Sequence, residues 1–595
     1  MINKKNIIEN MRICPIDEQE YESLIKEIVV ERQISVLLGS GISTWSPTEV
    51  PNGLAIVNSL AENLVPNEFP SYQQLREYVN HTAFEHIFER CPNHDKVRVW
   101  IAEHFSGEKP NEIHNAIAEL VKRGIILHVY TTNYDIAMDN ALTNAGVVVN
   151  RIIGKNDVWN PDEPSLIKLH GSVDNPSSLI FALRHESLME PWKRNILQQG
   201  LKNRILLVCG YSGMDFELSP ELVHCNCKKI IWNTFHNPIS NPEHITANTS
   251  RVILQTDGTI LAGNMVRLWT KLLGRQISVT KPLLTSNLAD YLFAKLSLSE
   301  IQIWRATLMV GIGFPKAAEF AIQSYLETSY SQPLSGYITS LVGQSLFHKG
   351  KYLSASRKFF EAAKLYAIEG NLVASLKEKL REVDSLRCYG AYFRAKKLLI
   401  SVDNESTGLI DDGLNGMVAR HKVLMFKQKF DLLSTFKMSR KSRKITTETK
   451  PILKYAYKLA LINGNWHDIQ MCEMWANRMK IPLSEIADGV ISPLPSREGF
   501  TQIGYFVGKW MALRDIAIHE KDNGKYLLEL NESLFETIAL GNDPETWKLS
   551  FLLITKSRLR FFNNIYYFLK GFYSCEYNIF FRFFLILRAF VTNSV

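Results

Sequence analysis

The chain has 595 residues and 46% of them are hydrophobic, which is enough for several cores and for about two to four domains. Its net charge of +8 predicts no specific nucleic-acid partner, because the basic residues are scattered apart from one cluster. The N-terminus lacks the apolar segment of a secretory signal and the eight cysteines are mostly isolated, so we expect reduced thiols in a cytoplasmic protein.

The first predicted elements are a helix, a buried strand and a glycine-rich loop. Residues 16–33 have the pattern of an amphipathic helix, and the apolar or small residues 34–38 are typical of a strand buried on both faces. Gly39 and Gly41 allow a sharp turn and leave no Cβ between the loop and a ligand. At the end of a parallel strand we expect such a loop to present amide groups to a diphosphate, with a plain turn as the alternative.

Helices fill the stretch before the second strand. Residues 54–64 are predicted to form a helix, and about 70–106 form a helical insertion rich in aromatic, histidine and charged residues. A further helix is predicted over residues 111–123, where Asn111 is a suitable N-cap.

Strands then alternate with helices, which predicts a Rossmann-like α/β domain whose parallel sheet is covered on both faces. The predicted strands cover residues 125–131, 147–153, 165–169, 179–183, 205–209, 229–233 and 252–255. Ligands bind at the carboxyl ends of the strands in such folds. Five strand ends carry glycine or polar residues, namely Gly39-Ser40-Gly41, Thr132-Asn133, His170-Gly171-Ser172, Gly210-Tyr211-Ser212 and Asn233.

A repeating helical pattern replaces the strands beyond about residue 280. A small residue, an aromatic residue and then Ala recur from Gly313, Gly350 and Gly390, and Lys429 and Gly464 continue the pattern more loosely. Intervals of about 35–40 residues are typical of helical hairpins that stack into a solenoid.

This change of pattern sets the predicted domains. The α/β domain covers residues 1–280, and a helical repeat domain covers 281–595. Residues 347–363 resemble a tetratricopeptide repeat, and the other repeats match it loosely.

Two stretches interrupt the repeats. The basic run 437–444 is predicted to be an exposed loop, with a phosphate-binding patch as the alternative. The aromatic stretch 561–591 is interrupted by Arg582 and Arg588, so it has no uncharged run of the ~18 residues that a spanning helix needs. We predict buried helices or an oligomer interface there and no membrane contact.

The five strand-end motifs together resemble the sirtuin-type NAD-binding fold over about residues 30–275. Residues 39–43 look like that family's Gly-Ala-Gly-x-Ser loop, with Ser40 in place of alanine. Residues 132–135 resemble its Gln-Asn-x-Asp motif, with Thr132 in place of glutamine. The remaining matches are His170-Gly171 to its catalytic His-Gly, Gly210-Tyr211-Ser212 to its Gly-Thr-Ser, and Asn233 to the asparagine that ends a later strand.

One departure from the family pattern separates this chain from protein deacetylases. Those sirtuins carry a four-cysteine zinc module between their His-Gly and Gly-Thr-Ser motifs. In this chain the corresponding residues 173–204 contain no cysteine. Cys225 and Cys227 form the only close pair and lack further ligands at zinc spacing, so we predict no metal.

A sirtuin-like domain without zinc, followed by a helical array, resembles the NAD-consuming effectors of prokaryotic antiphage defence. The resemblance implies an NAD hydrolase that produces nicotinamide and ADP-ribose, so that NAD depletion aborts infection. It also implies a homo-oligomer, and a phage protein that triggers the enzyme through the helical region.

The resemblance assigns catalysis to Asn133 and His170. Cleavage of the nicotinamide–ribose bond builds positive charge on the sugar. The amide of Asn133 is suited to orienting nicotinamide or the attacking water, and His170 is suited to accepting a proton and bonding a ribose hydroxyl. The predicted NAD-binding residues are Gly39, Ser40, Gly41, Ser43, Asp135, Gly210, Ser212 and Asn233.

Other interpretations stay open at this point. His170 is also consistent with a structural histidine, and Asn133 and Asp135 with plain helix N-caps. The same cleft would suit an NAD-dependent deacylase or an ADP-ribosyltransferase, or a non-catalytic sensor of NAD or ADP-ribose on a helical scaffold. Catalysis is favoured because a sensor needs neither a base nor an amide that positions water.

Overall fold

The computed structural model describes residues 8, 10–15, 19–185, 189–215, 217–241, 245–280, 288–328, 335–435, 439–463, 465–487, 505–519, 524–556, 561–579 and 581–585. Contacts divide the chain into two units. The sheet unit comprises residues 1–63, 83–89 and 93–296, and the helical unit comprises 64–82, 90–92 and 297–595.

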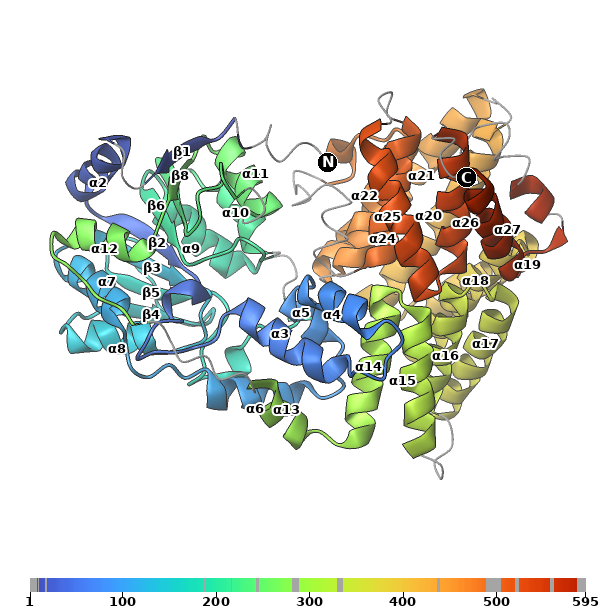
Figure 1. Cartoon of the computed structure of the whole chain (residues 1–595), viewed down its shortest axis with the longest axis horizontal. Coiled ribbons are helices and arrows are strands. Elements are labelled where there is room, and N and C mark those ends of the chain that lie inside the picture. The colour runs from blue at the N-terminus through green and yellow to red at the C-terminus, as the bar shows by residue number, and fades with distance from the viewer. Residues whose placement is uncertain are drawn as a thin grey trace. The chain divides into compact units, whose positions relative to one another are not determined.

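Within the described residues of the sheet unit, eight parallel strands form one sheet in the order β1-β8-β7-β6-β2-β3-β5-β4 (Figure 1). Their bounds are β1 (Arg12–Pro15), β2 (Ile34–Leu38), β3 (Ile126–Thr131), β4 (Asn150–Ile152), β5 (Ser165–Lys168), β6 (Ile205–Cys209), β7 (Lys229–Thr234) and β8 (Thr259–Ala262). The chain proceeds from β2 to β3 on one side and later returns to β6 on the other side of β2. The end of β2 is therefore the topological switch point, where such sheets bind ligands.

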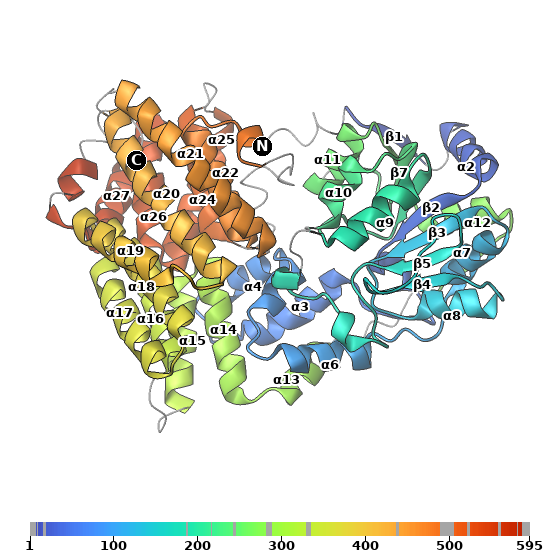
Figure 2. The ribbon, with the colours of Figure 1, turned by 180° about the vertical axis from the view of Figure 1, so that it is seen from behind.

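Each face of the sheet carries its own layer of helices (Figures 1 and 2). Val36 and Leu38 of β2 face one layer and Leu37 faces the other, which explains why the whole strand is apolar or small. The first layer contains α2 (Gln19–Glu31), α7 (Glu112–Lys122), α8 (Ala137–Asn144) and α12 (Met265–Leu273). The second contains α9 (Pro191–Leu201), α10 (Leu218–His224) and α11 (Ala247–Gln255).

The predicted α/β class is confirmed, although two predicted strands are wrong. Residues 252–255 end α11, where Val252 and Ile253 are buried while Leu254 is 43% exposed, a helical pattern of burial. Residues 179–183 connect two short 3₁₀ helices, η2 (Pro176–Ser178) and η3 (Leu183–His185). The short strands β1 and β8 were not predicted.

The predicted insertion is helical. It contains α4 (Tyr72–Asn80), α5 (Phe84–Glu89) and α6 (His94–His104) after α3 (Gly53–Leu64), while α13 (Leu288–Lys295) follows the last strand. The segment that includes α4 belongs to the helical unit. There, the ring of Phe69 contacts Phe320 and that of Tyr78 contacts Phe314, each at 5.1 Å between centroids.

The helical unit is a series of antiparallel hairpins (Figure 2). Gly313, Gly350 and Gly390 lie in turns between successive helices, each with a positive φ, as the repeat pattern predicts. Lys429 departs from the pattern because it lies within a helix, while Gly464 lies outside the described residues. The helices are α14 (Leu298–Ile312), α15 (Pro315–Thr328), α16 (Gly336–His348), α17 (Tyr352–Ile368), α18 (Leu372–Tyr389), α19 (Tyr392–Ser406), α20 (Asp412–Thr435), α21 (Ser439–Ile462), α22 (Trp466–Arg478), α24 (Phe506–His519), α25 (Gly524–Leu540), α26 (Asp543–Lys556) and α27 (Phe561–Ser574).

The structure contradicts the prediction for the basic run 437–444 and agrees with the prediction for the aromatic stretch 561–591. Residues 439–444 begin α21, so the predicted loop is wrong there, and 437–438 lie outside the described residues. In the tail, α27 packs its aromatic residues around the buried Trp547, as expected for a buried helix. None of the helices in the described ranges is long and apolar enough to cross a membrane.

The loop after β2 packs directly on the loop after β6. The amide of Gly39 donates to the carbonyl of Cys209 at 3.0 Å, and that of Gly41 donates to the carbonyl of Gly210 at 2.9 Å. A Cβ on Gly39 would lie 2.5 Å from the carbonyl oxygen of Gly210, and one on Gly41 would lie 2.9 Å from its Cα. Only glycine permits this approach of the two backbones.

Gly39→Ala is therefore expected to destabilise the sheet unit by about 1–3 kcal/mol, because backbone atoms have to move apart. The matched control is Gly154→Ala, where a Cβ meets nothing within 4 Å and the cost is expected to stay below about 0.5 kcal/mol. Urea unfolding of the full chain measures both variants. Equal midpoints would contradict the steric role of Gly39.

Candidate functional site

Most backbone amides of the glycine loop, residues 39–43, donate hydrogen bonds to carbonyl groups of the chain itself. Besides the Gly39 and Gly41 bonds, the amide of Ile42 donates to the carbonyl of Gly39 and that of Ser43 to the carbonyl of Ser40. The expected amide cradle for a diphosphate is therefore wrong for these four groups, which already have acceptors in the chain. The glycines are needed instead for the contact with Gly210.

The hydroxyl of Ser43 is the centre of a buried hydrogen-bond network. It accepts from the side-chain amide of Asn133 at 3.0 Å and lies 3.3 Å from Nε2 of His114. Nδ1 of His114 accepts from the amide of Asn111, and burial lowers the pKa of His114 to about 3, so the neutral ring carries its proton on Nε2. Ser43 thus accepts two hydrogen bonds and donates its own proton to the carboxylate of Asp135.

Hydrogen bonds hold the Asn133 side chain in one orientation and use its nitrogen but not its oxygen. Its backbone amide donates to the hydroxyl of Thr131 at 3.0 Å, and its side-chain nitrogen is occupied by Ser43. The side chain is 8% exposed, yet its Oδ1 accepts no hydrogen bond from any residue that the structure describes. A buried acceptor without a donor is costly, so a ligand or water that donates to it is favoured.

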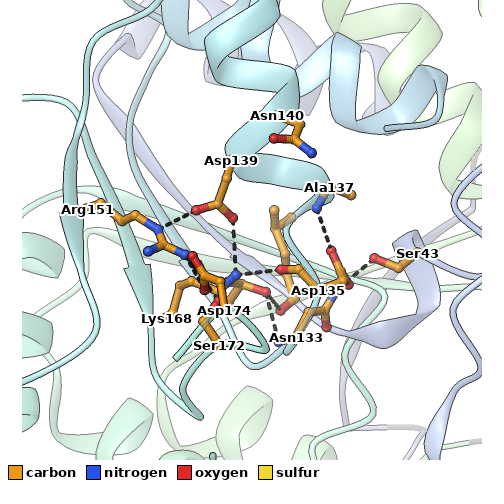
Figure 3. A network of polar contacts seen from close by, with 12 residues as sticks. Ser43, Asn133, Asp135, Ala137, Asp139, Asn140, Arg151, Lys168, Ser172 and Asp174 are labelled. Carbon is orange, nitrogen blue, oxygen red and sulfur yellow. Dashed lines mark hydrogen bonds and ion pairs between the residues drawn. The ribbon is translucent and has the colours of Figure 1, made fainter. Parts of the chain in front are cut away.

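Asp135 connects this network to a buried ion-pair network (Figure 3). Its carboxylate accepts from the amide of Ala137, the first residue of α8, although the N-cap position itself is Ile136, and its backbone carbonyl accepts from Nζ of the buried Lys168 at 2.5 Å. Burial raises the pKa of Asp135, and the charge of Lys168 and the Ser43 hydrogen bond oppose that rise. Lys168 also pairs with Asp139 at 3.1 Å, which in turn pairs with Arg151 at 2.5 Å.

His170 lies in a second buried cluster that the sequence did not predict. Its Nε2 is 2.6 Å from Oδ2 of Asp215 and 3.9 Å from Oε1 of Glu217, which also pairs with Lys193 at 3.2 Å. All four side chains are almost fully buried. Because Asp215 and Glu217 follow the β6 strand end, this cluster joins the end of β5 to the loop that contains Gly210.

The charge on His170 follows from these partners. Burial lowers the pKa of His170, but attraction to Asp215 and then to Glu217 outweighs burial and raises the pKa above its ordinary value. The pKa of Asp215 is lowered: burial raises it, but the charge of His170 outweighs burial. The resting state is therefore an imidazolium–carboxylate pair at mildly acidic pH, and His170 becomes a base only above its raised pKa.

Ser212 and Asn233 lie at the remaining strand ends. Ser212 is exposed, and its hydroxyl accepts from the amide of Met214 at 3.3 Å. Asn233 is buried at the end of β7, where its side-chain nitrogen donates to the carbonyls of Leu261 and Gly263. Its Oδ1, like that of Asn133, accepts from no residue in the described ranges.

The sheet with its strand-end residues can now be compared with known proteins. Residues 127–226 match the SIR2-like domain family. The match extends from β3 to the end of α10 and includes Asn133, His170 and Gly210. A search of the curated proteins finds no match to the chain.

The sheet unit brings the predicted residues together in two groups. Ser43, Asn133 and Asp135 contact one another directly, and Gly39 and Gly41 contact Gly210. The residues that sequence reasoning missed are His114, Lys193, Asp215 and Glu217. Of these, only the acidic pair offered a signal, because it closely follows the Gly210-Tyr211-Ser212 motif.

SIR2-like domains are associated with NAD, and the residues present fit such a ligand. Two buried amide oxygens at strand ends, on Asn133 and Asn233, remain available to donors. Gly39, Gly41 and Gly210 bring two strand-end loops into contact at the switch point. Among the described residues, no group of three or more histidine, cysteine or acidic side chains has the arrangement of a metal site.

Asp215→Asn is expected to lower the pKa of His170, because the variant removes the charge that opposes burial. In the native protein, His170 loses its proton only as the pH rises through a value above 6.5, and in the variant it loses it at lower pH. Histidine hydrogen–deuterium exchange, followed by mass spectrometry as a function of pH, measures this pKa. Asp162→Asn, at an exposed loop position, is the matched control.

Proposed function

We propose that the protein is an NAD hydrolase that cleaves NAD to nicotinamide and ADP-ribose. The observation that carries the proposal is the buried Oδ1 of Asn133, which Ser43 fixes in orientation and which accepts no hydrogen bond from the described residues. Asn133 follows the end of β3 beside the switch point, within the stretch that matches the SIR2-like family.

The geometry of Asn133 suits the positioning of a water or of the nicotinamide amide. Its nitrogen is occupied by Ser43, so only the oxygen is available, and an amide oxygen accepts from an O–H or N–H group. In the overall reaction the bond between nicotinamide nitrogen and ribose carbon breaks, a bond to water oxygen forms, and one proton is released. Asn133 would orient the reactants and would not carry that proton.

His170 is the candidate proton acceptor. It requires a pH above its raised pKa to accept a proton, and Asp215 then holds the ring in place and stabilises the imidazolium that forms. Ribose hydroxyl contact by this ring would also help to stabilise the positive charge that develops on the sugar. Ser40, Ser43, Ser212, Asp135 and Asn233 are proposed to bind the rest of NAD, on loops that the close contact of Gly39 and Gly41 with Gly210 holds together.

Asn133→Ala and His170→Ala are each expected to reduce nicotinamide release by about 10²–10⁴-fold, because each removes a group that acts on the reacting atoms. Purified full chain is incubated with NAD, and nicotinamide and ADP-ribose are followed by chromatography. The matched controls are Asn144→Ala and His224→Ala, which remove the same side chains from exposed positions on α8 and α10.

Four results would contradict this proposal. Near-native release by Asn133→Ala or His170→Ala would remove the assigned mechanism. Release of nicotinamide only in the presence of an acylated peptide would indicate a deacylase, and transfer of ADP-ribose to protein would indicate a transferase. Binding of NAD with no cleavage under any condition would indicate a sensor.

We also propose that the helical unit controls this activity in response to infection. The proposal rests on the resemblance to sirtuin-like effectors of antiphage defence and on the confirmed array of helical hairpins, whose inner surfaces suit a protein partner. Assembly into a homo-oligomer belongs to the same proposal.

Addition of phage-infected lysate is expected to raise NAD cleavage at least several-fold over uninfected lysate, because the trigger is present only after infection. The Asn133→Ala chain in the same lysates corrects for other NAD-consuming enzymes. Equal cleavage with both lysates would contradict control by a phage component, and size-exclusion chromatography with light scattering tests assembly.

A further inference from the structure

The two candidate catalytic residues lie on neighbouring loops of the sheet unit. Asn133 belongs to residues 132–136 after β3, the β3 loop, and His170 belongs to residues 169–175 after β5, the β5 loop. Strands β3 and β5 are parallel and adjacent, so both loops leave the same edge of the sheet. The placement of Asn133 relative to His170 therefore depends on the contacts that hold these two loops.

A buried lysine connects the β3 loop to helix α8. Nζ of Lys168 donates to the backbone carbonyl of Asp135 at 2.5 Å and pairs with Asp139 at 3.1 Å. Asp139 lies in the first turn of α8, so the lysine holds the loop against the helix that follows it. Both side chains are largely buried, and buried pairs are screened little by water or salt.

Arg151 on β4 continues these contacts to the β5 loop (Figure 3). Its Nε pairs with the second carboxylate oxygen of Asp139 at 2.5 Å. Its Nη2 donates to the hydroxyl of Ser172 at 3.1 Å and pairs with Asp174 at 2.8 Å. Because Ser172 and Asp174 both belong to the β5 loop, one guanidinium group contacts α8 and the β5 loop at once.

The chemistry of arginine suits this bridge. A guanidinium group is planar and presents its N–H donors in fixed directions, whereas the ammonium group of lysine is a point charge on a flexible stem. Burial lowers the pKa of Arg151, but the hydrogen bond to Asp174 and the charge of Asp139 outweigh burial and raise that pKa above its ordinary value. The bridge therefore stays charged at neutral pH.

We propose that Arg151 is a positioning residue that fixes how Asn133 faces His170. It reaches the β3 loop through Asp139 and its lysine partner, and it contacts the β5 loop directly. The inference rests on the proposed NAD hydrolysis, in which Asn133 and His170 act on one reacting bond. Misplacement of such groups by ~1 Å costs about 10²-fold in rate, so loss of the bridge is expected to lower kcat.

Arg151→Met removes the bridge with little risk to the fold. In this variant Asp139 keeps its pair with the buried Lys168, and Asp174 is 44% exposed and reaches water. Arg151→Lys keeps the positive charge but has a single nitrogen, so it is not expected to contact α8 and the β5 loop at once. The second variant therefore separates the charge of the side chain from its bridging geometry.

The matched control is Arg194→Met. Arg194 has the same exposed side-chain fraction as Arg151, 34%, and it pairs with Glu221 at 2.6 Å. That pair joins α9 to α10, and neither residue belongs to the β3 loop or the β5 loop. The control removes an equal charge and a comparable ion pair from the same unit. Thermal unfolding establishes that all three variants are folded.

Hydrogen–deuterium exchange of the full chain, followed by mass spectrometry, measures the bridge independently of NAD cleavage. Arg151→Met is expected to raise amide exchange in peptides that cover both loops by about 3- to 10-fold, because both lose a restraint. The amide of Val173, which donates to the carbonyl of Tyr134 at 2.9 Å between the loops, lies in one of these peptides. We expect a smaller increase in Arg151→Lys and none in Arg194→Met.

Steady-state cleavage of NAD measures the effect on chemistry. Arg151→Met is expected to lower kcat by about 10- to 100-fold and to change the KM for NAD by less than about 3-fold. In the Asn133→Ala background, the same substitution is expected to lower kcat by less than about 3-fold, since the group that the bridge positions is already absent. A purely structural effect would multiply fully with that of Asn133→Ala.

Three outcomes would overturn the proposal. The first is unchanged exchange of both loops in Arg151→Met. The second is faster exchange with an unchanged kcat, and the third is a loss of kcat that multiplies fully with that of Asn133→Ala. Failure of the native chain to cleave NAD would contradict the proposed function, and the exchange rates would then decide by themselves whether Arg151 holds the two loops together.

Discussion

The geometry of the strand-end site depends on the hydroxyl of Ser43. A hydroxyl has one proton and two acceptor positions, and here Asn133, His114 and Asp135 use all three. The other ring nitrogen of His114, Nδ1, contacts Asn111, the N-cap of α7. The buried His114 therefore links the start of α7 to the hydroxyl that orients Asn133.

Two buried charge systems flank this centre and use charge differently. Lys168, Asp139 and Arg151 form a structural chain that secures the start of α8 to neighbouring strands. His170 and Asp215 form a pair in which the carboxylate raises the pKa of the imidazole above its ordinary value. Pairs of the first kind maintain the positions of the groups around them, whereas the second kind contains a group that gains or loses its proton as the pH changes.

Much of the fold was predictable because it depends on local pattern. Strands such as 34–38 and 205–209 are short apolar runs followed by glycine, and the polar residues at their ends mark one edge of the sheet. The run 252–255 was wrongly assigned to a strand. Three apolar residues followed by a glutamine fit either a short strand or the last turn of a helix.

The rest depends on contacts between distant residues. His170 meets Asp215 only because β5 and β6 end at the same edge of the sheet, with β2 and β3 between them. A cavity of about 550 Å³ within the helical unit has the same origin, since the lysine and arginine side chains that line it come one or two at a time from helices such as α18, α20, α22 and α26. No window of sequence contains either arrangement.

The division of the chain into units limits how this protein can be rebuilt by recombination. Residues 64–82 and 90–92 belong to the helical unit, although the sequence on either side of them belongs to the sheet unit. The backbone therefore passes between the units repeatedly, and a gene break before Ser297 would separate Phe69 and Tyr78 from Phe320 and Phe314. Exchange of the helical half for another module would also require new partners for α4, so the two halves are expected to be inherited together.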